Sequence, residues 1–260
     1  MKRENCWKIY DENQLKELEE INSKYRNMLD SGKTERECVE LTINLAKKAG
    51  YKDLKEIIKN NDNIKTGDKV YAVCMNKAIV LYQIGEENIE NGMNILGAHI
   101  DSPRIDVKQN PLYEDSELVF LDTHYYGGIK KYQWVATPLA LHGVIIKKDG
   151  TKVNINIGEK DEDPVFVITD LLAHLSREQM DKTARTVVEG ENLDLLIANK
   201  PLKGEEKDAV KATVLKLLKD TYDIEEEDFL SAELEIVPAG KARECGIDKS
   251  MIMAYGQDDR

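Results

Sequence analysis

The feature that most constrains the fold is a change in secondary-structure signal along the chain. Apolar residues recur with helical spacing over residues 11–49, whereas residues 105–157 carry short apolar segments separated by turn signals, as consecutive strands do. Helical spacing returns at 208–222, and a further strand is expected at 232–237. A β-rich domain inserted into another domain produces this order. We therefore predict an α/β fold in two parts.

The first part carries clear helix boundary signals. Residues 11–30 have the apolar spacing of a helix. A second helix is predicted to begin at Thr34, because Glu37 three residues later completes a capping box. Gly50 stands where a C-terminal cap belongs, so this helix is expected to end just before it.

Strand signals follow these helices. Residues 69–75 and 78–84 are apolar and β-prone with a short connection, which predicts a hairpin. Residues 93–98 are interpreted as a short apolar strand that ends at His99. Further along, Asp149-Gly150 is a two-residue turn signal that predicts a second hairpin.

Composition restricts the classes of function. The chain has 260 residues and a net charge of −12, which disfavours nucleic acid as a partner because phosphate binding needs a basic surface. Apolar runs are too short to span a bilayer, so no membrane partner is expected. The polar first residues lack an apolar signal core, which favours the cytoplasm. The four cysteines form no Cys-x-x-Cys pair and are interpreted as reduced, mostly buried thiols.

His99 is the histidine with the most informative context. It follows the predicted strand at 93–98, and ligand sites in open α/β sheets lie at the carboxyl ends of strands. Asp101 lies two residues on, so in an extended chain it shares the same side as His99. A carboxylate in that place can orient a histidine that binds a metal. The His-x-Asp pattern alone is weak, since most single histidines are structural.

A second candidate metal-binding position is the pair Asp258-Asp259 near the last residue. Adjacent carboxylates are most often surface or capping groups. Their functional use would be oxygen ligation of a metal, with one carboxylate bridging two ions.

Several segments together resemble the M18 family of zinc metallo-aminopeptidases, the aspartyl aminopeptidase family. His99-Ile100-Asp101-Ser102-Pro103 resembles its first metal-binding motif, and the last five residues, Gly256 to Arg260, resemble the second. Between them lie the family's Tyr-Gly-Gly…Trp segment at 124–134 and the matching stretches at 163–164 and 168–175. The segments occur in family order over nearly the whole chain, and they match only the N-terminal portion of family members.

The resemblance implies a division into domains. Residues 1–103 and 241–260 would be the first and second parts of a partial α/β/α zinc-peptidase domain. Residues 104–240 would be an inserted β-rich dimerisation domain. In the family this domain builds dimers within a dodecamer, so self-association is expected.

The resemblance also assigns residue roles in a site that holds two zinc ions and acts on peptide substrates. His99 would bind one zinc ion, and Asp258 would bridge the two. Asp101 would have a catalytic role as the carboxylate that positions His99, and Asp259 would lie further from the metals. His174 would contact substrate in the active site of a neighbouring subunit. Cobalt and manganese occupy similar nitrogen and oxygen sites, so the physiological metal stays open.

The reaction implied is metal-assisted hydrolysis of the first peptide bond, in which a carboxylate acts as general base toward water. Family members supply a Glu-Glu pair, a further Asp and a final His beyond the matching portion. No counterpart of these residues is found in the sequence, and no histidine follows His174. Catalytic zinc normally has three protein ligands. We therefore predict that these 260 residues alone bind zinc weakly and are inactive or nearly so.

Two other readings compete with the peptidase. In the first, the β-rich domain serves as a non-catalytic assembly or oligomerisation module. In the second, the chain binds a phosphate or nucleotide, but Gly127-Gly128 and Lys203-Gly204 lack the spacing of a phosphate-binding loop.

Overall fold

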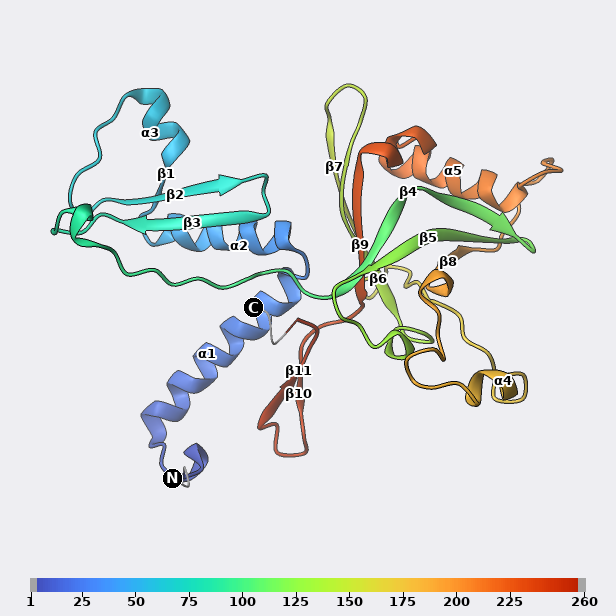
Figure 1. Ribbon diagram of the computed structural model, residues 1–260, viewed down its shortest axis with the longest axis horizontal. Coiled ribbons are helices and arrows are strands. Elements are labelled where there is room, and N and C mark those ends of the chain that lie inside the picture. Colours follow the sequence, from blue (N-terminus) through green and yellow to red (C-terminus); the bar gives the residue numbers. More distant parts are fainter. Residues whose placement is uncertain (1–3, 257–260) are drawn as a thin grey trace. The chain divides into compact units, whose positions relative to one another are not determined.

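The computed structural model describes residues 4–256 and divides them into two compact units (Figure 1). The first unit contains the chain up to Asp101 and from Lys241 onward, and the second contains Ser102–Gly240. The chain is a mixed α/β protein, as predicted. The roles that the resemblance gives to the two parts stay predictions.

Two helices begin the first unit after a short 3-10 turn, η1 (Cys6–Lys8). Helix α1 spans Glu12–Ser31 and α2 spans Glu35–Lys48. The capping box predicted between Thr34 and Glu37 is present at the start of α2. Gly50 follows the end of α2 with a φ of +86°, the left-handed conformation that favours glycine. The local sequence signals therefore placed these helix boundaries correctly.

A three-stranded sheet follows these two helices in the first unit. Strands β1 (Lys52–Asp53) and β2 (Lys69–Cys74) pair in parallel around α3 (Leu54–Asn60), and β2 pairs with β3 (Ala78–Gln83) in the predicted antiparallel hairpin. Helix α2 contacts β2 and β3. The small core of this unit is formed by Leu29, Cys38, Val39, Ala46, Ile57, Val70 and Tyr71.

The prediction of a strand at residues 93–98 is wrong. After the 3-10 turn η2 (Ile89–Asn91) this segment has no regular secondary structure, and the side chains of Ile95 and Leu96 are exposed. A strand needs a neighbouring strand for its backbone groups, and β-sheet pairing does not reach this segment within residues 4–256. An apolar sequence alone was therefore not sufficient to make a strand.

The second unit is built on a six-stranded antiparallel sheet in the order β7-β6-β9-β4-β5-β8 (Figure 1). The strands are β4 (Arg104–Asp115), β5 (Leu118–Tyr126), β6 (Leu139–Ile146), β7 (Lys152–Ile157), β8 (Leu195–Ala198) and β9 (Ala232–Pro238). The hairpin predicted at Asp149-Gly150 is confirmed by the β6–β7 pairing. Outside these strands, Phe166 and Val167 form isolated bridges to Leu139 and Leu196.

Helix α5 (Ala209–Tyr222) covers part of this sheet and contacts β4, β5 and β8. It agrees with the predicted helix at 208–222. Four short elements occupy the connections between strands: η3 (Lys131–Gln133), α4 (Arg177–Met180), η4 (Gly190–Asn192) and η5 (Glu226–Ser231). The sheet core includes Ile105, Leu139, Ile145, Leu195 and Ile236, all less than 2% exposed. Each such side chain stabilises the fold by about 1.5–3 kcal/mol relative to leaving it in water.

After the chain leaves the second unit, it forms another hairpin in the first unit. Strands β10 (Arg243–Cys245) and β11 (Met251–Met253) pair in antiparallel. The backbone N–H of Ala242, just before β10, donates to the Asp30 carboxylate at the end of α1. This bond connects the returning chain to the first helix.

All four cysteines are free thiols, as predicted. Cys38 is buried, but Cys6 and Cys74 are exposed, so the expectation that most are buried is wrong. Among the helices of residues 4–256, none combines the length and the apolar character required to cross a membrane.

Candidate metal and substrate site

The predicted pair of His99 and Asp101 is brought together in the first unit. The His99 Nδ1 atom lies 3.1 Å from the backbone carbonyl oxygen of Asp101 and 3.3 Å from its carboxylate Oδ1. Both oxygens can only accept, so Nδ1 carries the ring proton and donates it. The acceptor lone pair of the neutral ring is then on Nε2, which is the arrangement of a histidine prepared to bind a metal.

This pair lies at the surface. The side chain of His99 is 62% exposed and that of Asp101 is 37% exposed. An ion could therefore reach the imidazole from solvent without a change in the core. The backbone around His99 has no regular secondary structure.

The side chains of this site are of the types that bind zinc, but there are too few of them. Imidazole nitrogen and carboxylate oxygen are both usual zinc ligands. Within residues 4–256, however, the structure contains no group of three or more His, Cys, Asp or Glu side chains placed to hold a metal. Asp258, the predicted bridging ligand, and Asp259 lie outside the described residues.

His174, the predicted substrate contact, lies in the second unit on an exposed loop before α4. The loop is held by hydrogen bonds at both ends. The Asp170 carboxylate accepts from the Gln179 side chain at 2.8 Å, and Ser176 Oγ donates to the Ala173 carbonyl at 3.2 Å. Next to His174 the loop exposes Leu171, Leu172 and Leu175. His99 belongs to the first unit and His174 to the second.

The surroundings of the other two histidines do not indicate a role in metal or substrate binding. His124 is exposed on β5. His142 on β6 is only 1% exposed, and its Nε2 lies 3.0 Å from Glu159 Oε1. The Asn156 side-chain amide lies 3.4 Å from His142 Nδ1, and an amide nitrogen can only donate there. The ring is therefore a satisfied buried histidine that donates from Nε2 to Glu159.

A row of polar side chains crosses the sheet of the second unit, and sequence reasoning missed it. Asp106, Glu235 and His142 occupy paired positions on β4, β9 and β6. Arg104 Nε lies 2.7 Å from Asp106 and 3.2 Å from Glu235, so the buried carboxylate is compensated by a cation. The alternation Arg104-Ile105-Asp106 was a possible signal, because it places two charges on one face of a strand.

A cleft of about 620 Å³ opens in the second unit after β5. It is lined by residues 127–132 together with Tyr125, Ala184 and Arg185. Lys131 Nζ lies 5.7 Å from the centre of the Tyr125 ring, within reach of a cation–π contact. The sequence marked 124–134 only as a family segment. No local sequence signal predicted that Arg185, more than fifty positions later, also lines the cleft.

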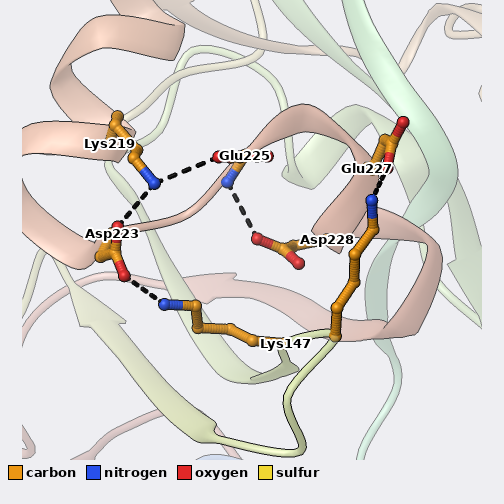
Figure 2. Close-up of polar contacts among 7 residues, drawn as sticks. Lys147, Lys219, Asp223, Glu225, Glu227 and Asp228 are labelled. Atoms are coloured by element: carbon orange, nitrogen blue, oxygen red, sulfur yellow. Dashed lines mark hydrogen bonds and ion pairs between the residues drawn. The ribbon is translucent and has the colours of Figure 1, made fainter.

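Surface ion pairs connect the β6–β7 hairpin to the end of α5 (Figure 2). Asp223 accepts from both Lys147 and Lys219, and Lys219 also reaches Glu225 at 3.1 Å. Hydrogen bonds from these two ammonium groups lower the pKa of Asp223 from 3.8 to about 2. Apart from the partly buried Lys147, these groups are exposed, and all are well separated in sequence from the candidate site, so their role is structural.

The mixed α/β architecture and the oriented histidine fit the class of metallopeptidases. The comparisons with known proteins give the family. The model of the family described as aminopeptidase I zinc metalloprotease (M18) matches residues 28–260. The chain belongs to the M18 family.

Individual relatives agree with this assignment. A probable M18 family aminopeptidase 1 from Clostridium acetobutylicum is 57% identical over 98% of this chain and 55% of its own length. The crystal structure of an M18 family aminopeptidase from Thermotoga maritima superposes with a TM-score of 0.92 and 45% identity, over 100% of this chain and 56% of that one. The S. cerevisiae mApe1 dodecamer, 16% identical over 91% of this chain and 52% of its own, shares the fold with a TM-score of 0.65. This chain spans about half the length of the curated relatives that it matches.

Proposed function

We propose that the chain forms the first portion of a zinc aminopeptidase that removes N-terminal residues from peptides. The observation that carries this proposal is the orientation of His99 by Asp101, at the position of the family's first metal-binding motif. The family match over residues 28–260 supports the same reaction class.

The proposed roles follow the chemistry of the side chains. His99 binds zinc through Nε2, since its Nδ1–H is engaged by Asp101. Asp101 is a positioning residue that fixes the ring tautomer and raises its basicity as a ligand. Asp258 would also hold zinc through its carboxylate, and His174 would contact substrate bound to a neighbouring subunit. When bound, zinc supplies a Lewis acid and a water of lowered pKa.

These residues are too few for a working centre. One imidazole and one shared carboxylate leave each zinc ion short of three protein ligands. We therefore expect a polypeptide of these 260 residues to release no N-terminal residue from aspartyl or leucyl peptides. The measurement is hydrolysis with added zinc, cobalt or manganese and with a chelator control. Metal-dependent release that disappears in His99→Ala would contradict this expectation.

A hybrid enzyme tests the positive half of the proposal. The portion of the C. acetobutylicum relative that this chain does not match is appended after residue 260. We expect metal-dependent aminopeptidase activity in the hybrid, a complete loss in His99→Ala, and a loss of roughly 10–100-fold in metal affinity in Asp101→Asn. His124→Ala is the matched control, because His124 is an exposed histidine outside the proposed site. An active hybrid that is indifferent to His99→Ala would exclude the proposed ligand.

The second candidate function is assembly without catalysis. It is favoured by the exposed leucines Leu171, Leu172 and Leu175 around His174, which form an apolar surface on the second unit. We propose that this loop contacts a second copy of the chain in a dimer-based dodecamer. Sedimentation of the chain should show oligomers that a Leu172→Ser, Leu175→Ser variant loses. A monomer at all concentrations would exclude this candidate for the 260 residues.

We also propose the cytoplasm as the compartment. The exposed free thiols of Cys6 and Cys74 support it, because exposed thiols persist in a reducing environment. Fractionation of cells that express the chain, with alkylation of these thiols before lysis, provides the test. A disulfide-linked population recovered outside the cytoplasm would contradict it.

A further inference from the structure

We propose that the cleft after β5 is a binding site for the carboxylates of an acidic peptide. The cleft has a volume of about 620 Å³, within the range of sites that bind ligands of several hundred daltons. Three cationic side chains, Lys130, Lys131 and Arg185, line it, and its lining contains no carboxylate. This local charge is opposite to that of the chain as a whole, whose net charge is −12.

The cations of the cleft differ from most others in the second unit. Lysines such as Lys108, Lys147 and Lys211 pair with nearby carboxylates. Over residues 4–256, no ion pair to a carboxylate engages Lys130, Lys131 or Arg185. An anionic ligand could therefore bind these cations without first breaking an internal ion pair.

Aromatic groups give the cleft a second binding property. Tyr125 and Tyr132 are 45% and 40% exposed, and the half-buried Ile129 also lines the cleft. Lys131 over the Tyr125 ring links the two kinds of group. Gly190 packs against the Tyr125 ring so closely that an added Cβ would lie 2.8 Å from it, which limits movement of that ring. A ligand with both an apolar surface and negative charges suits this lining.

The geometry favours carboxylates over phosphate. Phosphate sites usually place the backbone N–H groups of a helix N-terminus on the ligand. The only element that starts within the lining is η3, a 3-10 turn of three residues whose N-cap makes no side-chain hydrogen bond. Lysines bind anions as point charges, and the planar fork of arginine fits carboxylate and phosphate alike, so the preference rests on the missing helix N-terminus. Two or three residues of an extended peptide, at about 3.3 Å per residue, match the size of the site.

The choice of a peptide as ligand rests on the proposed aminopeptidase function, whereas the preference for negative charge rests on the cleft itself. The probe is an N-acetylated, C-amidated peptide of four glutamates with a fluorescent label, used with the full chain and a chelator. Acetylation removes the free amine, so binding of this probe does not depend on a working peptidase centre. The glutamine counterpart of the peptide and inorganic phosphate are the comparison ligands.

We expect the glutamate peptide to bind, the glutamine peptide not to bind, and the affinity to fall as salt is raised. The double variant Lys131→Gln, Arg185→Gln should weaken binding roughly fivefold or more. Lys152→Gln with Lys216→Gln is the matched control, because both lysines are exposed in the same unit outside the cleft. Arg185→Lys, which keeps the charge, should retain most of the affinity. Unchanged thermal unfolding would show that each variant is folded.

Three results would overturn the proposal. Equal binding of the glutamate and glutamine peptides would remove the role of charge. An equal effect of the cleft variant and the control variant would place the binding elsewhere. Displacement of the labelled peptide by phosphate at lower concentration than by the unlabelled glutamate peptide would assign the cleft to phosphate. Failure of the hybrid enzyme with retained peptide binding would reject the aminopeptidase proposal and leave this one standing.

Discussion

At the residue scale, Gly143 in β6 shows how closely two strands approach each other. Its φ is +139°, and a Cβ added there would lie 2.0 Å from the backbone carbonyl oxygen of Glu233 in β9. No side chain other than hydrogen fits this contact, since the neighbouring atoms are backbone and cannot rotate away. The β6–β9 pairing thus depends on one glycine.

We predict that Gly143→Ala destabilises the second unit by roughly 2–4 kcal/mol, because strand β9 must move or β6 must take a strained conformation. Urea unfolding followed by circular dichroism measures the change. Gly128→Ala is the control, since an added Cβ there meets nothing within 4 Å. Equal stability of the two variants would show that β6 and β9 are not paired in this register.

The lowered pKa of Asp223 predicts how the stability of the fold changes with pH. Its pKa is about 2 in the folded chain and 3.8 ordinarily, so the folded state favours the ionised carboxylate (Figure 2). The stabilisation is present above pH 3.8 and is lost as pH falls to about 2. We expect the difference in Tm between the chain and Asp223→Asn to shrink over this interval, and to be small throughout because the pairs are exposed. A difference that grows on acidification would reverse the assigned sign.

At the scale of elements, the start of helix α5 is capped by a strand. Asp208 holds the N-cap position with a φ of +48° and makes no capping hydrogen bond through its side chain. Instead, the Glu114 carboxylate of β4 accepts from the backbone N–H groups of Val210 at 3.0 Å and Lys211 at 2.8 Å. The negative charge lies at the positive end of the helix, so it stabilises α5 and fixes it on β4.

We predict that Glu114→Ala lowers the free energy of unfolding by about 1–2 kcal/mol, whereas Asp208→Ala has a much smaller effect. Denaturant unfolding of both variants makes the comparison. Hydrogen exchange should show that the first turn of α5 loses protection in Glu114→Ala. If Asp208→Ala were the more damaging change, the helix would be capped in the ordinary local way.

Elements specified by nearby residues were the ones that could be predicted from sequence. The capping box of Thr34 and Glu37 and the turn at Asp149-Gly150 involve residues within a few positions of each other. The cap of α5 could not be found this way, because Glu114 is 96 positions from Val210. The prediction of a strand at residues 93–98 was wrong for a related reason, since a strand is defined by its partner and not by its own apolar residues.

At the scale of the whole molecule, the α/β class and the family followed from segments spread along the chain. The candidate site was only partly predictable. His99 and Asp101 are two residues apart, so the extended chain sufficed to place them together. The cleft brings Tyr125, residues 127–132 and residues 184–185 into one lining, and only the folded second unit reveals that juxtaposition. The polar row of Asp106, Glu235 and His142 similarly depends on the order of the strands.

We predict that residues 102–240 fold without the rest of the chain, because they contain their own sheet and core. The fragment should show β-rich circular dichroism and a single cooperative thermal transition. The matched comparison is residues 1–101, whose three-stranded sheet has a smaller core. An unfolded 102–240 fragment would mean that the second unit depends on the first for its stability.

Because Ile105 pairs with Ile236, the second unit can be inserted into another protein as a whole. Strands β4 and β9 are antiparallel neighbours, so the chain enters and leaves this unit at adjacent points. A host protein can accept such an insert at a single surface loop, at little more entropic cost than lengthening that loop. The same geometry permits a short linker in place of the whole insert. Gain, loss or exchange of this unit between related enzymes would therefore require no rearrangement of the host's core.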